Sequence, residues 1–323
     1  MDSSVRFRPA RLDDTQTISE MFRATVPKWQ RLDEHGHVQD ESYADLSVYE
    51  RWLHGGPWMS IETSAIWLNH LLSGHGHCIV GVREREVAAY AEVFPGNEPE
   101  PFGKHLHIGR FIQQSSASNQ IEAAFMDHFF NLALNDGFDN VTVALSGYDK
   151  ERAQFYQQLG MQPVERVGRY MIPANIGQGF YKAIPHTNAD PAQIDGWQMI
   201  VGRTESARQQ WETLWPTLWQ TIDEIRRRQR HRLHLSAAGQ MAFIVCQQDL
   251  YDPRGAEIFC WSPMPLKPQL VTAIADWAHR KNYRRLLFSV PEHSVKILGP
   301  DIEAHPYQQD IYALNVHKLN DRG

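Results

Sequence analysis

The sequence predicts an α/β protein of two consecutive domains, each with a twisted, mixed and largely antiparallel sheet flanked by helices. A chain of 323 residues exceeds one ordinary hydrophobic core, and two domains of about 150 residues are the usual solution. Segments with the two-residue period of strands alternate with segments of helical periodicity. The order of these segments in residues 1–173 returns in residues 197–323, which indicates an internal repeat.

Apolar spacing and turn residues place the elements of the first half. Apolar residues repeat at three and four from 121 to 133, and the charged turn at 83–86 joins two strands as an antiparallel hairpin. Residues 29–57 are polar and are expected to form surface loops or short helices. The predicted strands are 5–8, 78–82, 87–94, 106–112 and 141–145, with one or two more in 161–171. The predicted helices lie around 18–22 and at 60–72, 121–133 and 150–159.

Prolines and glycines break all periodicity in residues 174–196, which are therefore expected to be a linker. In the second half, Trp211, Trp215 and Trp219 follow helical spacing, as a partner-binding face or, more typically, a core stripe does. The predicted elements there are strand 198–201, a Trp-rich helix to about 228, strands 233–236, 241–246 and 257–261, helix 269–280, and strands 286–290 and 310–315.

Composition excludes several classes of function. A formal charge of −6 and a pI near 6.2 give no general attraction to nucleic acid or to a membrane surface. The arginine run at 226–232 is either a phosphate-binding patch or, by the simpler interpretation, a solvated helix end. No metal-ligand motif, apolar signal segment or membrane span is found, and three cysteines favour a reducing compartment, so we expect a cytoplasmic protein without a metal site.

One segment carries a specific resemblance. Residues 152–161 read RAQFYQQLGM and resemble the helix before the sixth strand in the GNAT (N-acetyltransferase) superfamily, where an Ala, a Phe-Tyr pair and a Gly-Phe ending recur. Met161 stands where Phe is usual. The resemblance implies a tandem GNAT-fold protein with domains at 1–173 and 197–323. The resemblance to the family also rests on the Tyr90-Ala91-Glu92 strand, the Arg8-Pro9-Ala10 opening and the helix ending in Gly137 and Phe138.

The resemblance further implies acetyl-CoA as the acyl donor. In this family the fourth strand splays from its neighbour and binds the pantetheine, and a glycine-rich turn before the next helix binds the pyrophosphate through backbone N–H groups. A plain helix start is the alternative interpretation of that turn. In this sequence the strand positions are Phe111, Ile112 and Gln113, and the turn positions are Ser118, Asn119, Gln120, Ile121 and Glu122. Ser118, Gln120 and Glu122 stand where the family has glycines.

The corresponding turn of the second half carries two prolines. Pro263 and Pro265 stand at the glycine positions and have no N–H to donate, which leaves Lys267 as the residual phosphate ligand. The second domain is therefore interpreted as a degenerate, structural or substrate-shaping partner.

Acyl transfer to an amine needs a base and an acid for the leaving thiolate. The resemblance assigns the acid to Tyr156, and a packed helix surface is the alternative. Glu92 lies among apolar residues, as a cleft base or as a sheet-face carboxylate paired with a cation would. His105 and His107 share one strand face, and either imidazole could be the base, with His107 the candidate retained.

The leading hypothesis is an acyl-CoA-dependent N-acyltransferase, with acetyl as the default acyl group. Its acceptor would be a small amine or a peptide amine. The missing glycines of both halves motivate an alternative, a catalytically silent tandem GNAT-fold protein that binds a ligand or acts as a scaffold. A third interpretation is an interaction module that uses the tryptophans and the arginine run.

Overall fold

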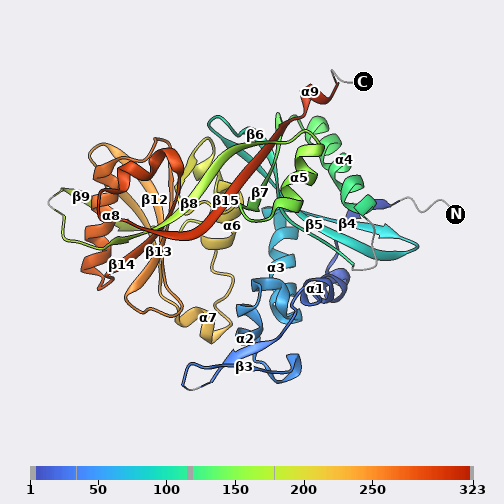
Figure 1. The fold of residues 1–323 in the computed structure, drawn as a ribbon, viewed down its shortest axis with the longest axis horizontal. Coiled ribbons are helices and arrows are strands. Elements are labelled where there is room, and N and C mark those ends of the chain that lie inside the picture. Colours follow the sequence, from blue (N-terminus) through green and yellow to red (C-terminus); the bar gives the residue numbers. More distant parts are fainter. Residues whose placement is uncertain (1–4, 34, 115–118, 178, 321–323) are drawn as a thin grey trace. The chain divides into compact units, whose positions relative to one another are not determined.

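The computed structural model describes residues 5–33, 35–114, 119–177 and 179–320 (Figure 1). The chain forms two compact units, and strands β5 and β6 run through both. Unit 1 comprises Met1–Phe94, Arg110–Leu132 and Leu218–Arg226, and unit 2 comprises Pro95–Gly109, Ala133–Thr217 and Arg227–Gly323. These units follow a different division from the predicted boundary at 174–196, which stays a prediction about the sequence repeat.

Unit 1 is built on a small antiparallel sheet in which β4 pairs with β1 and with β5. Val80 of β4 packs in a core with residues of α1 and α3, whereas a Cβ at the adjacent Gly81 would touch Phe125 of α4. Because neighbours on a strand point to opposite faces, α4 covers the face opposite α1 and α3. The elements are β1 Arg6–Pro9, α1 Thr15–Arg23, β2 Gln30–Leu32, β3 Val38–Asp40, α2 Val48–Leu53, α3 Ile61–His70, β4 His77–Arg83, β5 Glu86–Glu98, β6 Gly103–Gln113 and α4 Asn119–Asn135.

Unit 2 holds a long mixed sheet. Most neighbouring strands are antiparallel, but β6 and β7 are parallel, as are β13 and β14. Its strand order is β6-β7-β15-β8-β14-β13-β12-β11-β9, and β10 pairs with β13. The elements are β7 Asn140–Ser146, α5 Lys150–Gln158, β8 Gln162–Pro173, β9 Tyr181–Pro185, β10 Gln198–Val201, α6 Ala207–Leu214, β11 Arg230–Ala237, β12 Gln240–Gln248, β13 Gly255–Ser262, α8 Pro268–Arg280, β14 Arg285–Pro291, β15 Glu303–Asn315 and α9 His317–Asn320. Helix α7 Asp223–Arg227 belongs to unit 1 except for its last residue.

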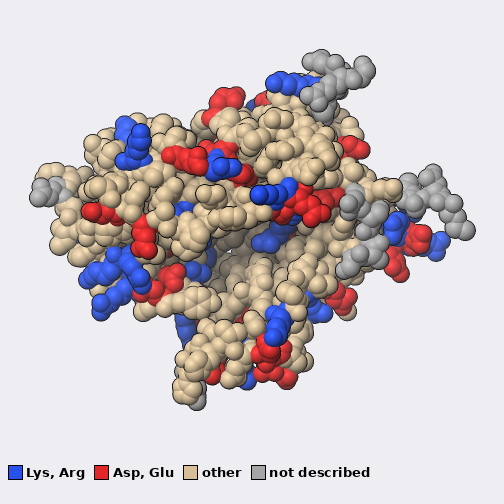
Figure 2. All heavy atoms as spheres, viewed as in Figure 1, with Lys and Arg blue, Asp and Glu red and all other residues tan. Residues whose placement is uncertain are grey.

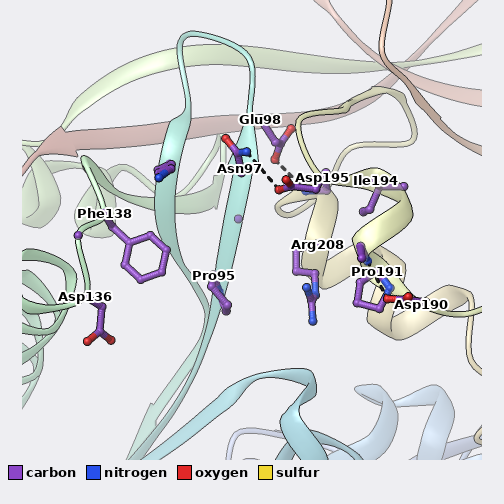
Figure 3. Close-up of a pocket in the computed structure, with 15 residues that line it drawn as sticks. Pro95, Asn97, Glu98, Asp136, Phe138, Asp190, Pro191, Ile194, Asp195 and Arg208 are labelled. Carbon is purple, nitrogen blue, oxygen red and sulfur yellow. Dashed lines mark hydrogen bonds between the residues drawn. The ribbon is translucent and has the colours of Figure 1, made fainter.

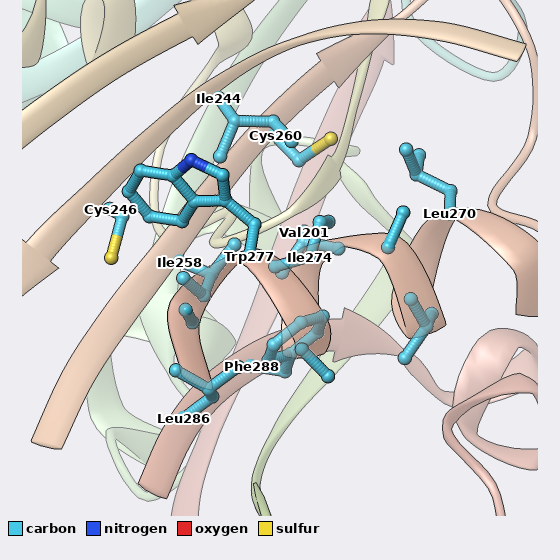
Figure 4. Close-up of a cluster of buried hydrophobic side chains, with 14 of the residues drawn as sticks. Val201, Ile244, Cys246, Ile258, Cys260, Leu270, Ile274, Trp277, Leu286 and Phe288 are labelled. Atoms are coloured by element: carbon cyan, nitrogen blue, oxygen red, sulfur yellow. The ribbon is translucent and has the colours of Figure 1, made fainter. Parts of the chain in front are cut away.

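The predicted repeat is confirmed as a repeat of topology. Strands β4, β5 and β6 are followed by α4 and by β7, which is parallel to β6. Strands β11, β12 and β13 are followed in the same way by α8 and by β14, which is parallel to β13. In the second copy, α8 packs Ile274 and Trp277 against the sheet residues Ile258 and Phe288 (Figure 4). The predicted mixed α/β class is therefore the observed one.

The last strand of each copy pairs across the repeat. Strand β15, at the end of the second copy, lies between β7 and β8 of the first, and β8 in turn pairs with β14. Both are long, with 12 residues in β8 and 13 in β15. The two copies consequently share one continuous ladder within unit 2.

Three predictions for the second half need correction. The Trp-rich helix is two short helices, α6 and α7, because Pro216 lacks the N–H that a continuing helix requires. The predicted linker contains β9, which pairs with β11. The arginine run is not one helix end, since Arg230 and Arg232 lie on β11 and donate to the carbonyl of Leu214 at the end of α6.

The tryptophan stripe is core, as its more typical interpretation predicted. Trp211 and Trp215 stack with ring centroids 4.0 Å apart in unit 2. Trp219 belongs to the core of unit 1, where it contacts Trp52. All three are buried, so they offer no exposed face to a partner.

Gly202 in unit 2 provides a stability prediction. Its φ is +85°, and a Cβ there would lie 2.6 Å from the carbonyl oxygen of Ile258. Gly202→Ala is expected to lower the free energy of unfolding by about 2–4 kcal/mol, because left-handed strain and a backbone clash combine. Gly239→Ala is the matched control, since its φ of +77° meets nothing within 4 Å, and it should cost about 1 kcal/mol. If urea unfolding shows the same loss of unfolding free energy in Gly202→Ala and Gly239→Ala, the predicted clash is contradicted.

Candidate functional site

Strand β6 carries several of the predicted site residues. Its parallel ladder with β7 runs from His105 opposite Asn140 to Ile108 opposite Val143. The ladder ends there, although β6 continues to Gln113 and β7 to Ser146. Beyond β6, the N–H of Gln114 donates to the carbonyl of Ala88 in β5, so the chain keeps its other neighbour. The backbone edge that faced β7 is thus released from the ladder after Ile108.

The predicted donor-binding residues of β6 lie in unit 1. Phe111 packs edge-on against Phe125 of α4 at 5.2 Å between ring centroids. Ile112 packs against the core that contains α1 and α3. The side-chain oxygen of Gln113 is buried and has no hydrogen-bond partner in the described residues. Of these three side chains, Gln113 alone has polar capacity to spare.

The predicted phosphate turn leads into α4. Ser118 lies outside the described residues, and Asn119 is the first residue of this 17-residue helix. Gln120 is exposed, Ile121 is buried and Glu122 is half-buried in the first turn. The first-turn N–H groups of a helix lack partners within it, and no proline removes one here. The backbone therefore retains the donors that an anion needs.

Glu92 of β5 lies in an aromatic cage in unit 1. Its carboxylate is fully buried and accepts hydrogen bonds from the indole N–H of Trp58 at 2.6 Å and of Trp67 at 3.1 Å. Burial, together with this neighbouring carboxylate, raises the pKa of Tyr90 well above its ordinary value. The cage ties α3 and the turn before it to the sheet, and the base role of Glu92 stays a prediction.

His107 of β6 is the centre of a polar network in unit 2. Its ring is buried, with Nδ1 at 2.9 Å from the hydroxyl of Thr142 and Nε2 at 2.9 Å from Oε2 of Glu205. Burial lowers the pKa of His107, so the imidazole is neutral at pH 7. With both nitrogens engaged, the ring is suited to orienting Glu205, and its role as a base stays a prediction.

Beside this network lies a buried ion pair. The guanidinium of Arg203 donates to both carboxylate oxygens of Glu98, and the N–H of Ala207 donates to one of them at 3.0 Å. Burial by itself would raise the pKa of Glu98, but Arg203 holds it below its usual range. Nε2 of His105 is 3.7 Å from the same carboxylate. The pair anchors the start of α6 to the end of β5.

Tyr156 of α5 also belongs to unit 2. Its side chain is 1% exposed and packs edge-on against Phe155 at 5.2 Å. Helix α5 begins where the side chain of Asp149 accepts the N–H of Arg152, and the chain turns at Gly160 with a φ of +91°. The resemblance motif therefore forms the expected helix, while the acid role of Tyr156 stays a prediction.

A cavity of about 630 Å³ opens in unit 2 beside the start of α6 (Figure 3). Asn97 donates to Asp195 at 3.1 Å across its wall, and Phe138, Asp190 and Arg208 line it. Its volume is in the range of small-molecule sites. Neither His107 nor Tyr156 is among its lining residues, so the cavity adjoins the polar network rather than containing it.

Sequence reasoning missed Glu205, Thr142 and the Arg203–Glu98 pair. The polarity of Thr142 in an otherwise apolar strand is a local signal that could have been used, whereas its place opposite His107 is decided by the pairing of β6 with β7. Glu205 is 98 residues from His107, and nothing local indicates that contact.

The face in Figure 2 shows acidic and basic side chains interspersed. In the described residues, no helix is long and apolar enough to cross a membrane.

Comparison with solved structures identifies similar folds. A GCN5-related N-acetyltransferase from Anabaena variabilis matches with a TM-score of 0.60 and 12% identity, over 97% of this chain and 73% of that one. A conserved protein from Enterococcus faecalis, described as a probable N-acyltransferase, matches with a TM-score of 0.57 and 12% identity, over 97% and 72%. A GCN5-related N-acetyltransferase from Kribbella flavida matches with 0.55 and 12%, over 96% and 70%. No family model and no curated protein matches the sequence.

Proposed function

We propose that this chain, which has the fold of the GCN5-related N-acetyltransferases, transfers an acyl group from acyl-CoA to a primary amine. Acetyl is the default acyl group, and the acceptor is a small amine or a peptide amine. The observation that carries the proposal is the ladder between β6 and β7, which ends at Ile108 while both strands continue. A released strand edge offers backbone N–H and C=O groups to the amides of a pantetheine chain.

The donor-binding elements fit a coenzyme A in two respects. The amide oxygen of Gln113 at the end of β6 is buried without a partner in the described residues, and it can accept from a pantetheine N–H. The first turn of α4 presents N–H groups and the positive end of a helix dipole to a pyrophosphate. The carboxylate of Glu122 in that turn repels the phosphate charge, so we expect a lower affinity for the pyrophosphate than a glycine turn would give.

In the reaction, the amine nitrogen attacks the carbonyl carbon of the thioester. The C–N bond forms, the C–S bond breaks, the amine nitrogen loses a proton and the departing thiolate gains one. We assign the second proton to the phenol of Tyr156, following the resemblance of residues 152–161 to the family motif. Glu92 and His107 are retained as the candidate bases for the first proton.

Calorimetric titration of acetyl-CoA into the full chain tests the donor site. Wild type is expected to bind at one site with micromolar affinity. Glu122→Gln is expected to tighten binding by about three- to tenfold, because it removes a repulsion of order 1 kcal/mol at the phosphate. Asp127→Asn is the matched control, since Asp127 is an exposed carboxylate further along the same helix, and it should leave the affinity nearly unchanged.

The possible outcomes separate the hypotheses. Binding that Glu122→Gln tightens and Asp127→Asn does not would place the pyrophosphate at the start of α4. Equal effects of the two variants would indicate a general charge effect. No binding up to millimolar acetyl-CoA would contradict the acyltransferase proposal and favour a catalytically silent ligand-binding protein.

A further inference from the structure

The two copies differ at the point where their parallel ladders end. In the second copy, β13 leaves β14 after Ile258, and β10 pairs with residues 260–262 of β13. The N–H of Gly202, which follows β10, donates to the carbonyl of Ser289 in β14. Strand β10 therefore lies between β13 and β14, and the gap of the second copy is filled by the chain's own backbone.

The corresponding edge of β6 in the first copy carries no such strand. In the part of the chain that the structure describes, β6 has β5 and β7 as its neighbours, and its ladder with β7 ends at Ile108. The first gap is thus the one that is open to an acyl-CoA. The proposed donor has its pyrophosphate beyond Gln113, so its pantetheine runs back along β6 and its thiol end comes nearest to Ile108.

The chain that leaves β10 reaches the strands of the first copy within unit 2. The guanidinium of Arg203 pairs with Glu98 at the end of β5. Two residues later, Oε2 of Glu205 is 2.9 Å from the ring of His107 on β6. These contacts place the first turn of α6 over β6, so the second copy supplies side chains to a strand of the first.

Gln209 in that turn lies against β6 where the first gap begins. A Cβ at Gly109, the residue after Ile108, would be 2.6 Å from both Cδ and Nε2 of Gln209. Only a glycine therefore lets the amide lie this close to the strand. The backbone N–H of Gln209 donates to the hydroxyl of Ser206 at 3.2 Å, which fixes the residue at the start of the helix.

The side-chain oxygen of Gln209 is an acceptor without a donor. Gln209 is 5% exposed, and its Oε1 is buried with no hydrogen-bond partner in the described residues. The neighbouring Gln210 shows the usual situation, since its amide donates to the carbonyl of Gly202 and to the hydroxyl of Thr204. Because buried polar atoms are normally paired, the oxygen of Gln209 favours a ligand that brings an N–H.

We propose that Gln209 belongs to the donor site of the first copy and accepts the N–H of the pantetheine amide nearest to the thiol. This inference rests on the proposed function and extends its donor site to a side chain of the second copy. Of the two amides in pantetheine, this one comes closest to Gly109, because the thiol end lies toward Ile108. An amide N–H is one neutral donor, which matches one free amide oxygen.

Calorimetry on the full chain compares two donors, acetyl-CoA and an analogue in which an ester oxygen replaces the N–H of that amide. Wild type is expected to bind the analogue about five- to tenfold more weakly, which corresponds to one neutral hydrogen bond. Gln209→Leu keeps the approximate size of the side chain and removes its oxygen. This variant should bind acetyl-CoA more weakly by a similar factor and should bind the two donors with Kd values within about twofold of each other.

Gln269→Leu is the matched control, since Gln269 is an exposed glutamine of α8 in the second copy. It should keep the wild-type Kd for both donors. Gln209→Leu is also expected to keep or raise the melting temperature, because it removes a buried acceptor that has no donor in the free protein. A purely structural role of Gln209 would lower the melting temperature instead.

Two results would overturn this inference while leaving the proposed function in place. One is a Kd for acetyl-CoA that is the same in wild type and Gln209→Leu. The other is an equal weakening of acetyl-CoA and the analogue in that variant, which would indicate a packing defect rather than a lost hydrogen bond. A wild-type protein that binds no acetyl-CoA would contradict the proposed function, and the inference with it.

Discussion

Arg203→Ala is expected to lower the free energy of unfolding by about 3–5 kcal/mol, because it leaves the carboxylate of Glu98 buried without its counter-ion. Arg203 is 2% exposed and Glu98 is 5% exposed, so water cannot replace the lost charge. Glu165, 3.4 Å from the guanidinium, loses the same partner. The N–H of Ala207 remains as a donor to Glu98 and limits the loss.

The stability that the Arg203–Glu98 pair contributes depends on pH. Arg203 depresses the folded-state pKa of Glu98, so the pair contributes stability above the unfolded pKa of about 4.3. That contribution is lost as the pH falls through the still lower folded pKa. The difference between wild type and Arg203→Ala should therefore be largest at neutral pH and should shrink below about pH 4.

Urea unfolding at pH 7 and at pH 3.5 measures the difference in unfolding free energy between wild type and Arg203→Ala at each pH. The double variant Glu98→Leu with Arg203→Met is the control, because replacing a whole buried ion pair by apolar side chains is often neutral. It should recover most of the stability that Arg203→Ala loses at pH 7. A loss of equal size at both pH values would indicate a packing defect rather than an unpaired charge.

Tyr156→Phe is expected to lower kcat about 100-fold or more while leaving the Kd for acetyl-CoA nearly unchanged. The variant removes the phenol proton that the proposed reaction gives to the leaving thiolate, and positioned acids contribute about 10²–10⁴ in rate. The ring stays in place, so the packing against Phe155 is retained. Steady-state thiol release with an accepted amine, together with calorimetry, separates kcat from binding.

Tyr148→Phe is the matched control for this experiment. Tyr148 lies in the turn before α5 and is 65% exposed, so loss of its hydroxyl should leave kcat within about twofold of wild type. An unchanged kcat in Tyr156→Phe would remove the acid role. A loss of both acetyl-CoA binding and thermal stability would assign Tyr156 to the core instead.

The sequence by itself determined most of the elements and their repetition, because the signals for these are local. Helix α8 begins with Pro268 as its first residue and keeps its apolar residues on one face, and the repeat of strand, helix and parallel strand follows from the order of such segments. The motif at 152–161 likewise placed α5 and indicated the fold. Periodicity also suggested the tryptophan stripe, although Pro216 divided the helix that it implied.

Only the tertiary structure decided which distant residues meet. The pairing of β15 with β7 and β8, and the contact of Glu205 with His107 across 98 residues, depend on topology rather than on neighbouring sequence. The pairing of Arg203 with Glu98 spans 105 residues in the same way. A charged residue in a sequence carries no mark of the partner that will allow its burial, because that partner is selected when the strands pair. The donor-binding prediction could therefore be made from one segment, whereas the contacts of Glu205 and Arg203 could not.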